Sequence, residues 1–476
     1  MALIRWAGRT ALVVVALVFL SACNSTRNNA FVPVDKSVAA HDYQTAINLL
    51  SDPSAGDSFY RADKDLVLQY LDVGMLYHIL GNSKASTKNF DEAERLIDEY
   101  FTKSITNAAL TFIVNDYMSE YAGEDYENIY LNVFKAIDYA RLNDFDGVFP
   151  EMKRMNGKLL LLKDKYQSLA DGYNSSKDTS DNKVAPGSAE FHDSALAHYL
   201  SAIVYRGDGR PDDADLELRK LDDVFRTSPK TFAFPKPDLK YILGPTDGKA
   251  RLNIVGFVGR SPIKKAKTLS INTGKNIIFI TTQYENAEGK MVYDAVVPFP
   301  LLGVSPGYNF KCQTPFMQPF DSNIATVAVL VDGKPAGNLA LIEDMAAVAA
   351  DTFKLREPII FTKTLVRTVV KGILAAKAKE AMKKGSESAG FAGALLNFGA
   401  GIALDATVEQ SEQADLRSAR YFPGKAYVGE VLTEPGKHQV VVQYLDKSGT
   451  LLWQETVAEK NVGQKGLNLV SSYAVF

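Results

Sequence analysis

The chain has 476 residues and a formal net charge of −3, with 53 Lys and Arg against 56 Asp and Glu. This near balance argues against a broad nucleic-acid-binding surface, which needs clustered positive charge. The length is sufficient for two or three domains, each with a hydrophobic core.

The first 22 residues have the layout of a secretory signal. Arg5 and Arg9 precede an apolar run from Ala11 to Leu20, which is too short to span a bilayer comfortably. The run ends in Leu20-Ser21-Ala22-Cys23, which resembles a bacterial lipobox. The resemblance implies cleavage before Cys23 and attachment of acyl chains such as palmitate to this cysteine. We therefore expect residues 1–22 to be a lipoprotein signal peptide, with Cys23 as the lipid attachment site.

The residue after the modified cysteine bears on the membrane in which the protein is anchored. Asn24 follows Cys23, and in the enterobacterial sorting rule, which is carried over by resemblance, a residue other than aspartate favours the outer membrane. We expect an outer-membrane anchor that faces the periplasm. An ordinary signal peptide with a chance cysteine, or an uncleaved anchor, is the alternative. After lipidation Cys312 has no cysteine partner, so we expect no intramolecular disulfide and a buried thiol.

Helical periodicity follows a short polar stretch at residues 23–34, which we interpret as a tether. From residue 35 to 228 apolar side chains recur at helical spacing, most clearly in two neighbouring segments. The first covers Leu66–Leu80 and ends at Gly81-Asn82. The second runs from about Lys84 to Tyr100.

This helix pair resembles a tetratricopeptide repeat (TPR), a helix–turn–helix unit of 34 residues. Gly74 and Ala93 stand where small residues let the helices approach, while Tyr70 and Phe90 stand where large ones fill the gap. A second match runs from about Ser201 to Leu221, although the proline usual at the repeat end is absent from the first. We expect residues 35–228 to form a TPR-like helical solenoid; a plain helical bundle is the alternative.

The pattern changes after residues 229–249, a stretch whose four prolines predict a linker. From residue 250 to 476 apolar and polar residues alternate with a period of two. Segments with this pattern predict strands at Leu252–Phe257, Asn276–Ile280, Lys290–Tyr293, Ala325–Leu330, His438–Tyr444 and Leu451–Glu455. Many short strands separated by turns predict an all-β domain, and an immunoglobulin-like sandwich is one candidate architecture. The predicted fold class is therefore α+β.

A helical insertion interrupts these strands at about residues 341–414. Pro358 predicts the start of a helix that runs to Lys384, with Lys363, Arg367 and Lys371 on one face. The uncharged segment Ala389–Leu404 is rich in Gly and Ala, which predicts close packing against a partner helix rather than insertion into a membrane. The basic face suits either an anionic membrane or a partner protein, or else a hairpin folded on the sandwich with its lysines in water. We favour the hairpin.

No motif for catalysis or metal binding stands out. Five histidines are present, at positions 41, 78, 192, 198 and 438, and the pair His192 and His198 does not have the zinc-binding spacing of one helical turn. The aspartates at 208, 212, 213 and 215 do not match a calcium loop. Gly244–Lys249 is one residue too short for a phosphate-binding loop. We therefore expect no metal site and no cofactor.

Two fragments have the pattern of penicillin-binding enzymes. Ser261-Pro262-Ile263-Lys264 matches S-x-x-K, and Ser180-Asp181-Asn182 matches S-D-N. Their order along the chain is reversed, the serine lies among predicted strands, and no K-T-G follows. We interpret both as chance matches, and we expect a protein without catalytic residues.

The lipobox and the TPR-like half, together with Glu120–Glu127 and Asp415–Arg420 followed by Phe422-Pro423, resemble a family of uncharacterised bacterial lipoproteins with TPR-like repeats. This resemblance implies an architecture and a location, and it brings no established activity. TPR-bearing outer-membrane lipoproteins in general serve as adaptors for periplasmic proteases or as activators of peptidoglycan synthases.

Three functions are consistent with these features. The first is a non-catalytic scaffold or adaptor that binds a periplasmic or envelope protein, with no nucleic acid and no small-molecule substrate inferred. The second is a structural subunit of an envelope assembly or secretion complex, in which the β-domain and the hairpin form the oligomer contact. The third, which we disfavour, is a cell-wall hydrolase or transferase.

Overall fold

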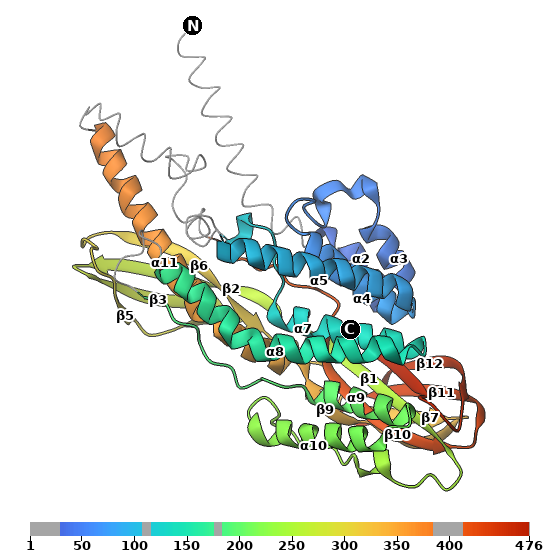
Figure 1. The fold of residues 1–476 in the computed structure, drawn as a ribbon. Helices are drawn as coiled ribbons and strands as arrows, with labels where there is room; N and C mark the ends of the chain where they lie inside the picture. The colour runs from blue at the N-terminus through green and yellow to red at the C-terminus, as the bar shows by residue number, and fades with distance from the viewer. Residues whose placement is uncertain (1–28, 107–115, 176–182, 384–412, 476) are drawn as a thin grey trace.

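The computed structural model describes residues 29–106, 116–175, 183–383 and 413–475. Within these ranges the chain is α+β, as the sequence predicts: a helical region comes first, and β-sheets follow from residue 250 (Figure 1). Cys23, Ser180–Asn182 and the Gly/Ala-rich segment Ala389–Leu404 lie outside the described residues. The predictions made for them therefore remain predictions.

The N-terminal helices pack in consecutive pairs, α2 with α3, α4 with α5, α7 with α8, and α9 with α10. Their bounds are Val32–Ala39 (α2), Tyr43–Leu50 (α3), Leu66–Leu80 (α4), Ser83–Thr106 (α5), Asp125–Arg141 (α7), Phe145–Asn174 (α8), Ala195–Gly207 (α9) and Pro211–Thr227 (α10). Three short 3-10 turns join them to their neighbours, at Pro53–Ser58 (η1), Asp116–Met118 (η2) and Lys240–Leu243 (η3).

Local sequence signals explain where the α4–α5 pair turns and how closely its helices approach. Helix α4 ends at Gly81, whose left-handed φ of 83° lets its N–H bond the carbonyl of His78. This confirms the predicted end of the helix. Gly74 then lies against the Phe90 ring of α5, and a Cβ added at Gly74 would meet that ring at 3.0 Å. The predicted close approach of the two helices at a small residue is confirmed.

The strands form three sheets, with orders β13-β1-β10-β9 (first), β12-β11-β7-β8 (second) and β4-β3-β2-β6 (third); β5 also pairs with β3. Their bounds are Ala250–Arg260 (β1), Ile263–Gly274 (β2), Ile277–Glu285 (β3), Met291–Tyr293 (β4), Val297–Pro300 (β5), Asn309–Gln318 (β6), Thr326–Val331 (β7), Lys334–Asn338 (β8), Ala340–Asp344 (β9), Pro423–Thr433 (β10), Gly436–Leu445 (β11), Leu451–Val462 (β12) and Leu469–Ala474 (β13). Strands β1 and β13 are parallel. The second and third sheets lie toward opposite ends of the molecule (Figure 1).

Helical and β parts share one hydrophobic cluster. The ring centroid of Phe134 on α7 lies 5.4 Å from that of Phe257 on β1 and 5.6 Å from that of Phe422. The Phe257 ring in turn stacks on the ring of Tyr473 on β13, with a centroid distance of 5.0 Å. These aromatic contacts connect the helices directly to the first sheet. Residues on both sides of 229–249, the predicted linker, therefore contribute to the same core.

Two further clusters complete the core. One lies between the first and second sheets and includes Ile254, Val329 and Val442. The other lies between the third sheet, α8 and helix α11 (Met345–Lys383), and it includes Cys312, which is buried as the sequence predicts.

Helix α11 differs from the prediction in two ways. It begins at Met345 and continues through Pro358, which the sequence analysis had taken as its start. Two side chains of the predicted basic face are not in water either: Lys363 pairs with Asp116 at 2.8 Å, and Arg367 is buried. Both expectations were wrong, because the helix is packed against α7, α8, β6 and β10 rather than standing on a surface.

Candidate functional site

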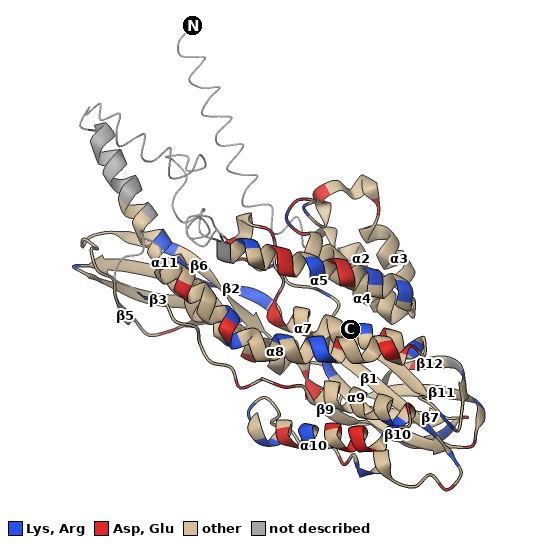
Figure 2. Cartoon of the chain, viewed as in Figure 1, with Lys and Arg blue, Asp and Glu red and all other residues tan. Residues whose placement is uncertain are grey.

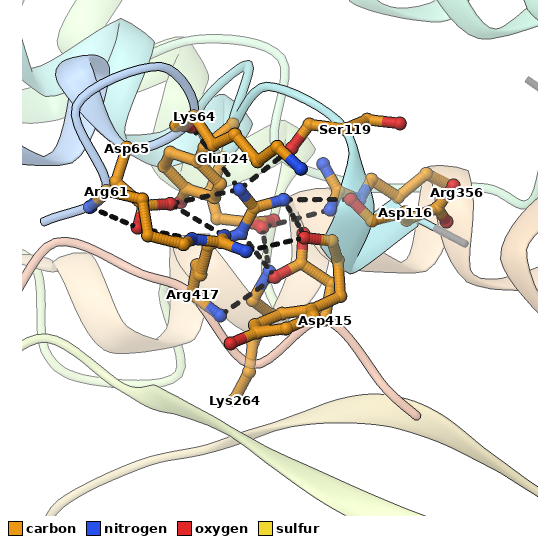
Figure 3. Close-up of polar contacts among 12 residues, drawn as sticks. Arg61, Lys64, Asp65, Asp116, Ser119, Glu124, Lys264, Arg356, Asp415 and Arg417 are labelled. Carbon is orange, nitrogen blue, oxygen red and sulfur yellow. Dashed lines mark hydrogen bonds and ion pairs between the residues drawn. The ribbon is translucent and has the colours of Figure 1, made fainter. Parts of the chain in front are cut away.

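The segment 413–420 enters the interior between the N-terminal helices and the sheets, and Arg417 is its centre (Figure 3). The guanidinium of Arg417 donates two hydrogen bonds to the carboxylate of Asp415, both at 2.8 Å. It also donates to Oδ1 of Asp65 at 3.1 Å and to the backbone carbonyls of Ser119 and Asp116 at 3.0 and 2.8 Å. One buried side chain thus joins α4, η2 and the chain that leads into β10.

A second set of charges surrounds Glu124, which precedes α7. Its Oε1 accepts from Nζ of Lys264 on β2 at 2.6 Å and from Arg356 of α11 at 2.9 Å. Glu124 also begins α7 as half of a capping box with Glu127, whose side chain accepts from the backbone N–H of Glu124. Glu124 therefore connects strand β2, helix α11 and the start of helix α7.

Burial and charge determine the ionisation of this network. Burial alone would raise the pKa of Asp415, but Lys264 and Arg417 hold it well below its usual range. Burial, with the nearby charge of Glu124, raises the pKa of Glu127 to about 7. Asp415 and Arg417 thus remain charged, and the network is an ion cluster rather than a proton donor–acceptor pair.

A cavity of about 190 Å³ adjoins the network. Helix α11 lines it with Arg356, Lys363 and Arg367, while Asp116 and Asp415 face them from the other side. Both carboxylates are held in ion pairs, with Lys363 and Arg417 respectively. Glu120 is a third carboxylate in the lining of this cavity.

An open groove of about 550 Å³ lies between α5 and α8. Glu94 and Asp98 line it from α5, and Arg154, Lys158 and Leu161 line it from α8. Nζ of Lys158 lies 2.6 Å from Glu94 and 2.7 Å from Oδ1 of Asn132 on α7 beneath. Figure 2 shows charges of both signs along α5 and α8.

Leu161, which lines this groove, and Leu160, which precedes it in the sequence, are both exposed. The side chains of Leu160 and Leu161 on α8 are 75% and 63% exposed. Burial would raise the pKa of Glu94, but Lys158 and Lys135 lower it to about 2, so this wall of the groove stays ionised. Adjacent apolar side chains beside fixed charges of both signs are features of a protein-binding surface.

The structure also locates the fragments that resemble enzyme motifs. Ser261 and Lys264 are both buried, and Lys264 bonds Glu124; no hydrogen bond joins the two side chains within the described residues. Gly244–Lys249 leads into strand β1 and not into a helix, so it cannot cradle a phosphate at a helix start.

The histidines and aspartates likewise have structural partners. His198 lies between Glu217 (2.5 Å) and Asp193 (2.9 Å). His192 bonds the carbonyl of Glu190, which keeps it apart from His198. Asp213 pairs with Arg210 at the start of α10. Across the described ranges, no group of three or more His, Cys, Asp or Glu side chains is arranged to hold a metal ion.

Sequence reasoning did not predict the Arg417 network. It did single out Glu120–Glu127 and Asp415–Arg420, through the family resemblance alone, and the structure brings these two stretches together. The backbone N–H of Ala419 donates to Glu127 at 2.6 Å. Glu120–Glu127 is acidic and Asp415–Arg420 holds charges of both signs, but neither pattern indicates which residues pair.

The comparisons with known proteins add no assignment. No family model, no curated protein and no solved structure matches this chain. In the part of the chain that the structure describes, no helix is both long enough and apolar enough to cross a membrane.

Proposed function

We propose that this protein is an outer-membrane-anchored periplasmic lipoprotein that acts as a non-catalytic scaffold for another envelope protein. The lipobox at Leu20–Cys23 supports the anchor. The ion-paired state of Asp116 and Asp415 supports a role without catalysis. In this proposal the lipid holds the partner at the membrane.

The groove between α5 and α8 is the main observation that supports a protein-binding role. Its two neighbouring leucines and its mixed charges suit an amphipathic helix of the partner, with apolar residues on one face and charges of both signs on its flanks. Lys158 and Glu94 are already fixed by each other, so a docking helix would meet a preorganised surface.

The finer architecture belongs to the same proposal. The pairing of α4 with α5 and of α9 with α10 supports a TPR-like solenoid, in which each pair is one repeat. The hydrophobic cluster between the first and second sheets supports a β-sandwich, for which the immunoglobulin type is one candidate.

Substitution of the leucines tests the scaffold proposal. In intact cells, chemical crosslinking of the lipidated protein followed by mass spectrometry should capture one dominant envelope protein. Leu161→Glu should abolish that capture, whereas Leu216→Glu, at an exposed position on α10, should leave it unchanged. Equal capture by both variants would place the partner elsewhere and contradict the groove.

A specific observation favours the second function, a structural subunit of an envelope assembly. Exposed apolar side chains belong to strands β3, β4 and β5 of the third sheet and to the loops beside β5: Phe279, Met291, Tyr293, Val296, Val297 and Leu302. A second copy of the chain could bury this surface. Light scattering of the lipidated protein in mild detergent tests this: an oligomer that Tyr293→Lys dissociates would support it, and a strict monomer would contradict it.

A further inference from the structure

A second cavity, of about 390 Å³, is lined in part by Arg417. Phe31 and Tyr60 border it from the N-terminal region, Arg260 and Phe320 from the β-region, and Arg420 from the segment 413–420. Its volume falls within the range of small-molecule sites in proteins. The proposed scaffold function makes no use of this cavity.

The charges that line this cavity are unbalanced. Arg260, Lys264, Arg417 and Arg420 supply four positive charges, against the single carboxyl group of Asp72. The carboxylates that pair with three of these cations are not part of the lining: Glu124 pairs with Lys264, Asp415 and Asp65 with Arg417, and Asp35 with Arg420. The carboxylates that hold these cations are therefore outside the cavity lining, and the lining itself is mostly positive.

Asp72 offsets only part of this positive charge. Its side chain accepts from the Tyr60 hydroxyl at 2.8 Å and from the backbone N–H of Arg420 at 2.6 Å, so both oxygens are engaged. Burial raises the pKa of Asp72 to about 6, so this carboxyl group loses its charge only below about pH 6.

Two arginines are oriented by aromatic rings. The guanidinium of Arg420 lies over Phe31 at 4.3 Å, and that of Arg260 lies over Phe320 at 5.0 Å. Stacking on a ring fixes the plane of a guanidinium, whose N–H groups point outward along its edge. Nε of Arg420 is buried, and within the described residues it makes no hydrogen bond. Such a donor is costly to leave without an acceptor.

The two arginines also repel each other. Burial, with the charge on Arg420, lowers the pKa of Arg260, against the attraction of Asp35 and Asp72. An anion between the two guanidinium groups would relieve both the repulsion and the unmade hydrogen bond. The remaining walls are aromatic or aliphatic and include Leu68, Tyr117 and Leu416.

We propose that this cavity binds a small molecule that carries one oxyanion group, carboxylate or phosphate, on an apolar or aromatic body. Arg260 and Arg420 clamp the oxyanion through their N–H edges, and the aromatic and aliphatic walls enclose the body. Because the segment 413–420 forms one wall, the ligand would also fix that segment against the N-terminal helices.

Calorimetric titration of the full lipidated protein in detergent tests the proposal. Phenyl phosphate and benzoate serve as the two oxyanion probes, and phenol and inorganic phosphate supply the body and the anion separately. We expect saturable 1:1 binding of at least one of the first two, weaker binding of inorganic phosphate and none of phenol. The better of the two oxyanion probes identifies the preferred group.

Variants locate the binding. Arg420→Gln and Arg260→Gln should each weaken binding by about tenfold or more, since each removes charge-assisted hydrogen bonds. Arg226→Gln, at an exposed arginine on α10, is the matched control and should bind as the wild type does. Because Arg420 also pairs with Asp35, its variant could unfold; Leu416→Trp, which fills the cavity and keeps every charge, should then abolish binding independently.

Three results would overturn the proposal. The first is the absence of saturable heat with any probe on folded wild-type protein. The second is equal binding by the wild type, Arg260→Gln and Leu416→Trp. The third is binding to phosphatidylglycerol vesicles without binding of phenyl phosphate or benzoate, because it would assign the cations to a lipid headgroup.

Discussion

Nη1 of Arg417 donates to Oδ1 of Asp65 at 3.1 Å, although the two residues are 352 positions apart in the sequence. Asp65 also accepts from Arg61 at 2.9 Å, so two arginines share one buried carboxylate. Through this contact the chain that leads into β10 closes against the start of α4. The helical and β regions are therefore parts of one folded unit at this point.

Removal of Arg417 should destabilise the protein strongly. Arg417→Ala removes both hydrogen bonds of Arg417 to the buried carboxylate of Asp415 and leaves Asp65 with Arg61 alone. The loss of one member of a buried ion pair costs about 3–5 kcal/mol. Urea denaturation followed by circular dichroism measures the free energy of unfolding. Arg226→Ala on the surface should change it by less than about 0.5 kcal/mol. A loss below about 1 kcal/mol for Arg417→Ala would show that the network contributes little.

The α4–α5 contact predicts a contrast between two glycines. Gly74→Val places a side chain against Phe90, where even a Cβ lies at 3.0 Å, so overpacking should cost about 1–3 kcal/mol. Gly157 on α8 has no atom within 4 Å of its added Cβ, so Gly157→Ala should stabilise by about 0.5–1 kcal/mol. Thermal melts of both variants measure the difference, and equal effects would contradict the close approach of α4 and α5.

The His198 clamp predicts a pH dependence of stability. Burial opposes its protonation, but hydrogen bonds to Asp193 and Glu217 raise its pKa from 6.5 to about 9. Because the pKa of His198 is higher in the fold than in the unfolded chain, protonated His198 contributes its full stabilisation below pH 6.5. This contribution is lost as the pH rises through 9. It amounts to about 3 kcal/mol, since one pKa unit corresponds to about 1.4 kcal/mol.

The variant His198→Gln isolates this effect from other titrating groups. The difference in unfolding free energy between the wild type and the variant should be largest below pH 6.5 and should shrink as the pH rises from 6.5 through 9. Denaturant titrations across this interval provide the measurement. A difference that does not change with pH would mean that His198 is neutral in the fold.

The lipid anchor is tested at Cys23. Cys23→Ser should accumulate as an unprocessed precursor, because the peptidase that cleaves a lipobox requires the lipid-modified cysteine. The variant should incorporate no labelled palmitate, whereas Cys312→Ser should be processed and labelled normally. Metabolic labelling and gel mobility provide both readouts, and normal labelling of Cys23→Ser would remove the lipoprotein interpretation.

The fold could be predicted from the sequence where one element carries its own signal. Leu66–Leu80 has helical spacing and ends before a glycine, and the structure shows a helix with these bounds. Strand β2 was not predicted, because Lys264, Lys265 and Lys267 break its apolar alternation. In the fold Lys267 lies over the Phe316 ring at 5.2 Å, so its stem packs where an apolar residue would be expected.

Features that depend on distant partners could not be predicted. The helix start at Pro358 was wrong because α11 continues through the proline; Gly187, distant in the sequence, packs there and donates to the carbonyl of Leu355 at 2.9 Å. The Arg417 network needs Asp65 and Asp415 in one place, and no local pattern specifies that pairing. The α5–α8 groove is formed by two helices from different pairs, so its walls share no sequence motif.

Site-specific photocrosslinking at position 161, in cells that express the full lipidated protein, tests the scaffold claim most directly. A photoreactive residue replaces Leu161 in the groove, and a second variant carries it at Leu216 on α10. Our account predicts that position 161 captures one envelope protein that position 216 does not, and that Arg154→Glu weakens this capture. The same products from both positions, or none from position 161, would contradict it.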